Sequence, residues 1–154
     1  MLRARLESTT EYERIIAFAA AQGLEYDPEE TEDFSDIVGA WKLTQPGDHI
    51  IGTIMLGYEE GHYVLHAVAV DPVLRKFGLG RILVKKAMEK ARELGGDEVV
   101  LIGRAPEFYS KLGFTEIDPE NSPLEFECLT CPQFQVSCHP KIMKYEIPAD
   151  GPVL

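Results

Sequence analysis

The sequence predicts a mixed α/β domain, and the order of four segments carries that prediction. The apolar segment 63–70 is short and rich in β-branched residues, as a buried strand is. A glycine-containing turn, an amphipathic helical pattern and a second apolar segment, 99–102, follow it. A strand, a helix and a strand in this order form a right-handed βαβ unit. We therefore expect the stretch 63–114 to be the centre of the fold.

Three antiparallel strands are expected before this centre. The segments 37–43, 49–57 and 63–70 are apolar and β-branched, and the polar, glycine-containing turns between them are short. Residues 1–6 alternate enough to add an edge strand. Near the other end of the chain, 124–127 and 142–147 have the composition of two more strands.

Two helices are expected from their periodicity and their end signals. Thr10 and Glu13 have the spacing of a capping box, and Gly23 follows an apolar pattern that this box would open. The helix after the glycine turn repeats apolar residues on one face, namely Leu79, Leu83, Ala87, Ala91 and Leu94. Both helices should pack an apolar side against the sheet.

The turn Arg75-Lys76-Phe77-Gly78-Leu79-Gly80 places bare backbone N–H groups at a helix N-terminus, where an anion can approach. It is not a P-loop, because Gly-Lys-Ser/Thr is missing. It is not a dinucleotide fingerprint either, because the third glycine is replaced by Leu83 and no acid closes the second strand.

The pattern that fits is Arg/Gln-x-x-Gly-x-Gly/Ala, which resembles the acetyl-CoA pyrophosphate loop of the GNAT superfamily of N-acetyltransferases. Residues 106–114 read Pro-Glu-Phe-Tyr-Ser-Lys-Leu-Gly-Phe. They resemble the Phe-Tyr-x-x-x-Gly-Phe helix and turn of the same superfamily. The resemblance implies a GNAT fold: a twisted, mixed but mostly antiparallel sheet of about six to seven strands flanked by helices, with a βαβ core that binds acetyl-CoA.

The resemblance also implies which residues hold acetyl-CoA. Backbone groups of the central strand would hold the pantetheine arm and the thioester, and the glycine turn with its cations would hold the pyrophosphate. The corresponding positions are Val68, Ala69, Val70, Arg75, Lys76, Phe77, Gly78, Leu79, Gly80 and Arg81. The chain departs from the pattern after the second strand, where many members carry an Asn and this chain has Gly103 and Arg104.

Two side chains are candidates for proton transfer. The resemblance gives Tyr109 the role of acid toward the departing thiolate, and the alternative is a tyrosine that only packs. His66 is the candidate base, expected to share a face with Val64, Val68 and Val70, and the alternative is a core histidine. The segment 65–70 also resembles arylalkylamine N-acetyltransferases, which carry His-x-His before a similar Ala-x-Ala-Val, although Val64 replaces the first histidine.

Other candidates for the base lie at the turn before the central strand. They are Glu59, Glu60 and His62, and a water-mediated route through His66 or a glutamate stays open. The acceptor pocket is built from loops that carry no transferable motif, so the acceptor is not read from the sequence.

Length and composition predict one domain, 1–154, and limit the kinds of partner that the protein can bind. A net charge of −11 argues against nucleic acid, which requires clustered Lys and Arg, and would favour cationic substrates. No apolar run approaches the roughly 20 residues that span a bilayer, and the N-terminus has no signal-peptide pattern, so we expect a cytoplasmic protein without membrane partners. A homodimer stays open.

Cys128, Cys131 and Cys138 allow three interpretations: plain buried thiols, a metal site with His139, or a redox pair. Cys138 and His139 are adjacent and do not easily face one metal, so no metal site is predicted.

The prediction from the sequence is an N-acetyltransferase that moves the acetyl group of acetyl-CoA to a primary amine of a small molecule or peptide by direct attack. The alternative is a non-catalytic domain of the same fold that binds acyl-CoA as a sensor or partner.

Overall fold

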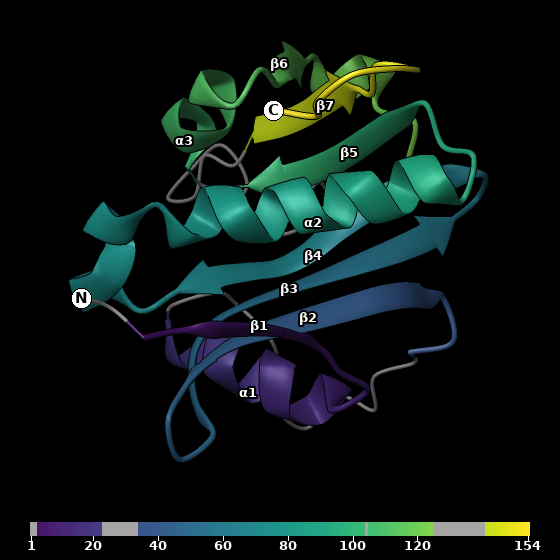
Figure 1. The fold of residues 1–154 in the computed structure, drawn as a ribbon. Coiled ribbons are helices and arrows are strands. Elements are labelled where there is room, and N and C mark those ends of the chain that lie inside the picture. The colour runs from purple at the N-terminus through teal and green to yellow at the C-terminus, as the bar shows by residue number, and fades with distance from the viewer. Residues whose placement is uncertain (1–2, 23–33, 104, 125–140) are drawn as a thin grey trace.

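The computed structural model describes residues 3–22, 34–103, 105–124 and 141–154. In this part of the chain a sheet of seven strands runs in the order β1-β2-β3-β4-β5-β7-β6 (Figure 1). The strands are β1 Arg5–Ser8, β2 Ile37–Gln45, β3 His49–Glu59, β4 His62–Val70, β5 Glu98–Gly103, β6 Thr115–Ile117 and β7 Lys141–Glu146. The α-helices are α1 Tyr12–Ala21, α2 Leu79–Glu93 and α3 Pro106–Lys111, with short 3₁₀ turns at Pro72–Phe77 (η1) and Pro119–Asn121.

The predicted order of elements from β1 to β5 is confirmed, whereas β6 was not predicted. Strands β1 to β4 pair antiparallel in sequence order, β4 and β5 pair in parallel, and α2 connects them. β7, close to the predicted 142–147, pairs antiparallel with β5. Of the predicted strand 124–127, only Leu124 lies within the described residues, and the three cysteines lie outside them.

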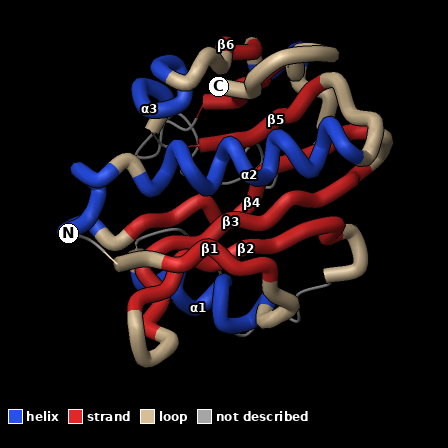
Figure 2. Tube along the Cα trace, viewed as in Figure 1, coloured by secondary structure: helices blue, strands red, loops and turns tan. Residues whose placement is uncertain are grey.

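Two helices cover opposite faces of the sheet, as Figures 1 and 2 show. α2 packs its buried residues against the core formed with β2 to β5, among them Leu83 and Met88. α1 buries Ile15 and Ala19 against small residues of β2 and β4 on the other face. Leu94, expected on the apolar face of α2, caps that helix instead and is 44% exposed.

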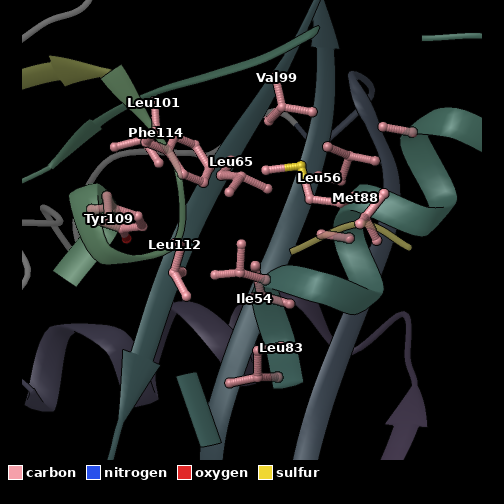
Figure 3. Packing of buried hydrophobic residues seen from close by; sticks show 14 of the residues in the cluster. Ile54, Leu56, Leu65, Leu83, Met88, Val99, Leu101, Tyr109, Leu112 and Phe114 are labelled. Carbon is pink, nitrogen blue, oxygen red and sulfur yellow. The ribbon is translucent and has the colours of Figure 1, made fainter. Parts of the chain in front are cut away.

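The core under α2 holds the centre of the molecule together. Figure 3 shows Ile54 and Leu56 of β3 and Leu65 of β4 meeting Leu83 and Met88 of α2, and all five are buried. Full burial of an aliphatic side chain of this size stabilises a fold by about 1.5–3 kcal/mol. The strands that border the candidate site are therefore fixed from the α2 side.

The start of α1 differs from the prediction. The capping box is wrong, because Glu11 is the N-cap and no side chain caps the helix. Thr9 lies one residue before the expected cap, and its hydroxyl accepts a hydrogen bond from the backbone N–H of Glu11 (3.0 Å). This local turn delays the helix to Tyr12. At the other end the helix stops at Ala21, before Gly23, which lies outside the described residues.

Ion pairs link the first turn of α1 to the sheet. The Nζ atom of Lys42, a nearly buried residue of β2, lies 2.6 Å from Glu11 Oε1 and 3.2 Å from Asp48 Oδ1. Arg14 Nη1 lies 2.7 Å from Asp48 Oδ2. The hydrogen bond from Lys42 lowers the pKa of Glu11, and the hydrogen bond from Arg14 lowers the pKa of Asp48. The network fastens the first turn of α1 to the β2–β3 hairpin.

Candidate active site

The sheet opens between its two parallel strands. β4 and β5 pair only at Tyr63 with Val99 and at Val64 with Val100, although β4 continues to Val70 and β5 to Gly103. On its other edge β4 stays paired with β3 as far as Val70. The two strands therefore separate toward the end of the sheet where η1 and α2 begin.

The backbone of β4 points polar groups into this opening. Successive residues of a strand direct their N–H and C=O groups to alternate sides. The N–H of Asp71 bonds to Ile51 O of β3 (2.9 Å), and Ala69 pairs with Thr53 of the same strand. The backbone groups of Val68 and Val70 therefore face the β5 side, where the register provides no partner in the described structure. Of the three predicted strand residues, Ala69 faces β3.

A β-bulge sets this direction. The register between β3 and β4 shifts between the pairs Thr53–Ala69 and Met55–His66, and Ala67 has φ +52°. A left-handed backbone costs a non-glycine residue about 1–2 kcal/mol. The fully buried Thr53 hydroxyl donates to the carbonyl of Ala67 (2.9 Å), so a polar group displaced by the bulge keeps a partner. Such bulges re-aim side chains beside functional sites.

The bulge also changes which residues share a face with His66, because Val68 and Val70 do not lie on that face as expected. Tyr63, Leu65, Val68 and Val70 all pack on the α2 side, because the extra residue inverts the alternation after Leu65. His66 instead shares the opposite face with Val64 and lies between two apolar groups there. One contains Ala67 and Ala69 beneath α1, and the other contains Val64, Val100 and Leu124.

On that face His66 contacts an acid. Its Nε2 lies 2.9 Å from Glu59 Oε1, and both side chains are 30% exposed. The hydrogen bond with His66 lowers the pKa of Glu59, although partial burial acts in the opposite direction. The sequence suggested Glu59 only as a turn residue, because a pairing between positions seven residues apart depends on the register of the β3–β4 hairpin.

The glycine turn leads into an uncapped helix. η1 ends at Gly78, which has φ +70° and serves as the N-cap of α2 without a side-chain hydrogen bond. The first hydrogen bond of the helix at this end runs from the N–H of Ile82, which donates to Gly78 O. The N–H groups of Leu79, Gly80 and Arg81 are therefore left without helical partners. The sequence predicted bare N–H groups at this helix start, and the binding of an anion to them stays a prediction.

Cations surround that helix end. Arg75, Lys76 and Phe77 are exposed, and the Lys76 ammonium lies 5.4 Å from the centroid of the Phe77 ring. Neither Arg75 nor Lys76 forms an ion pair within the described structure. Arg81 Nη2 donates to Leu154 O (2.8 Å).

Tyr109 lies in α3 and packs beside Gly103, the last residue of β5. The residue is 7% exposed, and its ring makes edge contacts with Phe108 and Phe114, whose centroids are 5.0 and 5.4 Å away. Figure 3 shows Tyr109 and Phe114 in this cluster. A Cβ atom at Gly103 would lie 3.0 Å from Tyr109 Cε2, so the ring packs directly against this glycine. A Cβ at Gly80 would likewise come within 2.8 Å of Phe108 Cζ. These contacts join the two sequence motifs.

Comparison with known proteins decides the family. A family model described as the acetyltransferase (GNAT) family matches residues 6–114, which is most of the chain. The chain belongs to the GNAT family of acetyltransferases. The match includes the glycine turn, the opening between β4 and β5, and Tyr109.

Two curated relatives match shorter stretches. An uncharacterised N-acetyltransferase of Chlorobaculum tepidum is 32% identical over 71 residues, 45% of this chain and 46% of that protein. An amino-acid acetyltransferase of Mycobacterium tuberculosis is 35% identical over 63 residues, 41% of this chain and 35% of that protein. The matched region spans less than half the length of either relative.

Solved structures show the same fold along nearly the whole chain. A GNAT-family acetyltransferase from Staphylococcus aureus has a TM-score of 0.71 at 19% identity, covering 95% of this chain and all of that one. N-acetylglutamate synthase from Neisseria gonorrhoeae, solved with coenzyme A and N-acetyl-glutamate, has a TM-score of 0.71 at 16% identity, covering 96% of this chain and 36% of that one. This GNAT fold confirms the predicted α/β class.

Two further findings concern the described residues alone. None of their helices is long and apolar enough to cross a membrane. Their His, Cys, Asp and Glu side chains form no cluster of three or more that could hold a metal.

Proposed function

We propose that this protein transfers the acetyl group of acetyl-CoA to a primary amine by direct attack, without a covalent enzyme intermediate. The observation that carries the proposal is the opening between β4 and β5. It begins just beyond Leu65, beside His66, and leads toward the uncapped N-terminus of α2. A long cosubstrate with an anionic end and a reactive thioester end matches that layout.

The residues present fit acetyl-CoA at both ends. The free N–H groups at the start of α2, with Arg75 and Lys76 beside them, suit a pyrophosphate. The backbone groups of Val68 and Val70 suit the amide-rich pantetheine arm, which hydrogen-bonds in the manner of an added strand. When bound, acetyl-CoA supplies an electrophilic thioester carbonyl.

The chain's own side chains would handle the protons. The incoming ammonium must lose a proton before its nitrogen can attack, and we assign that proton to His66. The nitrogen–carbon bond then forms and the carbon–sulfur bond breaks, while the nitrogen loses a second proton to water. The departing thiolate needs a proton in return, and we assign that donation to Tyr109, because an unperturbed phenol is protonated at neutral pH. Water then returns a proton to the phenolate.

The acceptor class follows from the relatives and from charge. One curated relative is named an amino-acid acetyltransferase, and one structural neighbour was solved with N-acetyl-glutamate. The chain's net charge of −11 favours cationic amines by steering. From the names of the relatives we propose amino acids as the first acceptors to test. The charge of the chain adds polyamines as the second, followed by arylalkylamines, aminoglycosides and N-terminal peptides.

Release of free CoA thiol from acetyl-CoA in the presence of each amine tests the proposal. We expect one amine class to raise thiol release well above hydrolysis, with an acetylated product of matching mass. In that assay Tyr109→Phe should keep acetyl-CoA affinity while turnover falls by about ten- to a thousandfold. Tight CoA binding with no turnover across the panel would favour the non-catalytic acyl-CoA sensor, and equal turnover in Tyr109→Phe would leave that residue a packing role.

A further inference from the structure

We infer that Glu59 is a positioning residue for the proposed reaction: its carboxylate holds a proton on Nε2 of His66 and so leaves Nδ1 as the basic nitrogen. The inference rests on the proposed role of His66 as the base. It adds a second residue and names the atom that receives the proton.

The contact is built by the hairpin. Glu59 is the last residue of β3 and lies opposite His62, while His66 lies four residues further along β4, opposite Met55. The two side chains reach along the same face of the sheet and meet at 2.9 Å. A glutamate at a hairpin end is normally free to extend into solvent, but this side chain is only 30% exposed. It is therefore held back against the sheet by the histidine.

Gly57 makes room for the contact. This residue is paired with Val64 across the hairpin. A Cβ atom there would lie 3.4 Å from Glu59 Oε1 and 3.4 Å from both Cδ2 and Nε2 of His66. The glycine therefore lies directly beneath the hydrogen bond, and a long side chain at this position would compete with both partners for the same space.

The direction of the hydrogen bond fixes the tautomer. An ionised carboxylate can only accept a hydrogen bond, and a neutral imidazole carries one N–H donor and one acceptor nitrogen. The hydrogen bond with His66 lowers the pKa of Glu59, so the carboxylate is ionised at neutral pH. Nε2 is therefore the donor. Nδ1 has no hydrogen-bond partner within the described residues, and its lone pair is available.

The proton balance follows. The acceptor's ammonium gives one proton to Nδ1, and the ring becomes an imidazolium with a proton on each nitrogen. The carboxylate of Glu59 keeps its negative charge and faces this new cation through Nε2–H. After the amide product leaves, Nδ1 returns its proton to water, and the dyad is restored. Glu59 does not touch the substrate at any stage.

Kinetics of three single variants and one double variant test the inference. Glu59→Gln keeps the size of the side chain and removes its charge, and Glu60→Gln, the exposed neighbour in the same turn, is the matched control. We expect Glu59→Gln to lower kcat by about ten- to a hundredfold, the range for carboxylates that orient metal-bound histidines, with acetyl-CoA affinity unchanged. Glu60→Gln should match the wild type.

The double variant separates positioning from a general effect on structure. If Glu59 acts only through His66, Glu59→Gln combined with His66→Gln should be no slower than His66→Gln alone. A double variant whose loss of kcat is the product of the two single losses would show that Glu59 acts by another route and would overturn the inference. So would wild-type kcat in Glu59→Gln when His66→Gln is impaired. Wild-type kcat in His66→Gln would instead remove the base from the proposed function, and the role of Glu59 would fall with it.

Imidazole ¹⁵N NMR tests the tautomer without any activity. In the wild-type protein, the neutral form of the His66 ring should carry its proton on Nε2 and none on Nδ1. A proton on Nδ1 would contradict the inference even if the enzyme acetylates amines. The Glu60→Gln control should leave the His66 signals in place.

Discussion

Thr53→Val would remove the hydroxyl that supports the bulge in β4 while keeping the shape of the side chain. Thr53 is fully buried, and its hydroxyl donates a 2.9 Å hydrogen bond to Ala67 O, where the backbone has φ +52°. Valine fills the same volume but cannot donate. The carbonyl of Ala67 would then be buried without this partner, and the bulge would lose its main polar support.

The size of the effect can be worked out from these contacts. Leaving a buried acceptor unsatisfied costs about 1–3 kcal/mol. The new methyl group offsets up to about 0.8 kcal/mol of that loss. The net destabilisation should be about 1–2 kcal/mol, which lowers the melting temperature of a domain of this size by about 2–8 °C. Because the bulge aims Val68 and Val70 toward β5, affinity for CoA should fall as well.

Thermal unfolding and calorimetric titration with CoA measure both effects. Thr44→Val is the matched control, since Thr44 is a buried threonine of β2 whose hydroxyl makes no hydrogen bond within the described structure. It should change neither the melting temperature nor the CoA affinity by a comparable amount. Equal stability and equal CoA affinity in Thr53→Val and the wild type would refute the view that this hydroxyl holds the bulge and that the bulge shapes the site.

Two other predictions concern charge. Arg75→Gln should weaken CoA binding by about three- to tenfold at low salt and less at high salt, because an exposed cation acts through a screened field, and Lys86→Gln in the third turn of α2 is the control. A CoA affinity in Arg75→Gln that equals that of the wild type, or a loss that does not depend on salt, would exclude Arg75 from the pyrophosphate site. Lys42→Met should make the stability of the fold less sensitive to acid. The pKa values of Glu11 and Asp48 are lowered in the folded protein. The stability that these two carboxylates contribute is therefore present above the ordinary carboxylate range and is lost as pH falls through the lowered values. The melting temperature should therefore drop less between about pH 5 and about pH 3 in Lys42→Met than in the wild type, and an equal drop would mean that the network adds no stability.

The fold could be predicted because its signals are local. The strands 37–43, 49–57 and 63–70 are marked by β-branched runs and by short turns, and both helices have an apolar periodicity. The start of α1 could not be predicted, because Thr9 competes with Thr10 for the role of the first turn residue. Propensity alone does not decide between two neighbouring threonines.

The positions of the candidate residues could be predicted where they depend on motifs and not where they depend on strand register, and their roles stay predictions. The glycine turn and Tyr109 were found from their spacing, and their contact through Gly80 and Phe108 agrees with that pairing of motifs. His66 shares a face with Val64 as predicted, but the prediction that Val68 and Val70 lie on that face was wrong, because strict alternation along β4 ignores the extra residue at Ala67. No glycine marks that bulge. The contact of His66 with Glu59 was missed for a different reason, since it joins two strands and depends on the register of their hairpin.

Titration of the ¹⁵N-labelled protein with acetyl-CoA, followed by amide NMR, tests the central claim most directly. If the cosubstrate lies in the opening between β4 and β5, the amide signals of Val68 and Val70 should shift together with those of Leu79, Gly80 and Arg81 at the start of α2. Saturable shifts confined to other parts of the chain, with these five amides unmoved, would contradict the proposed acetyl-CoA site.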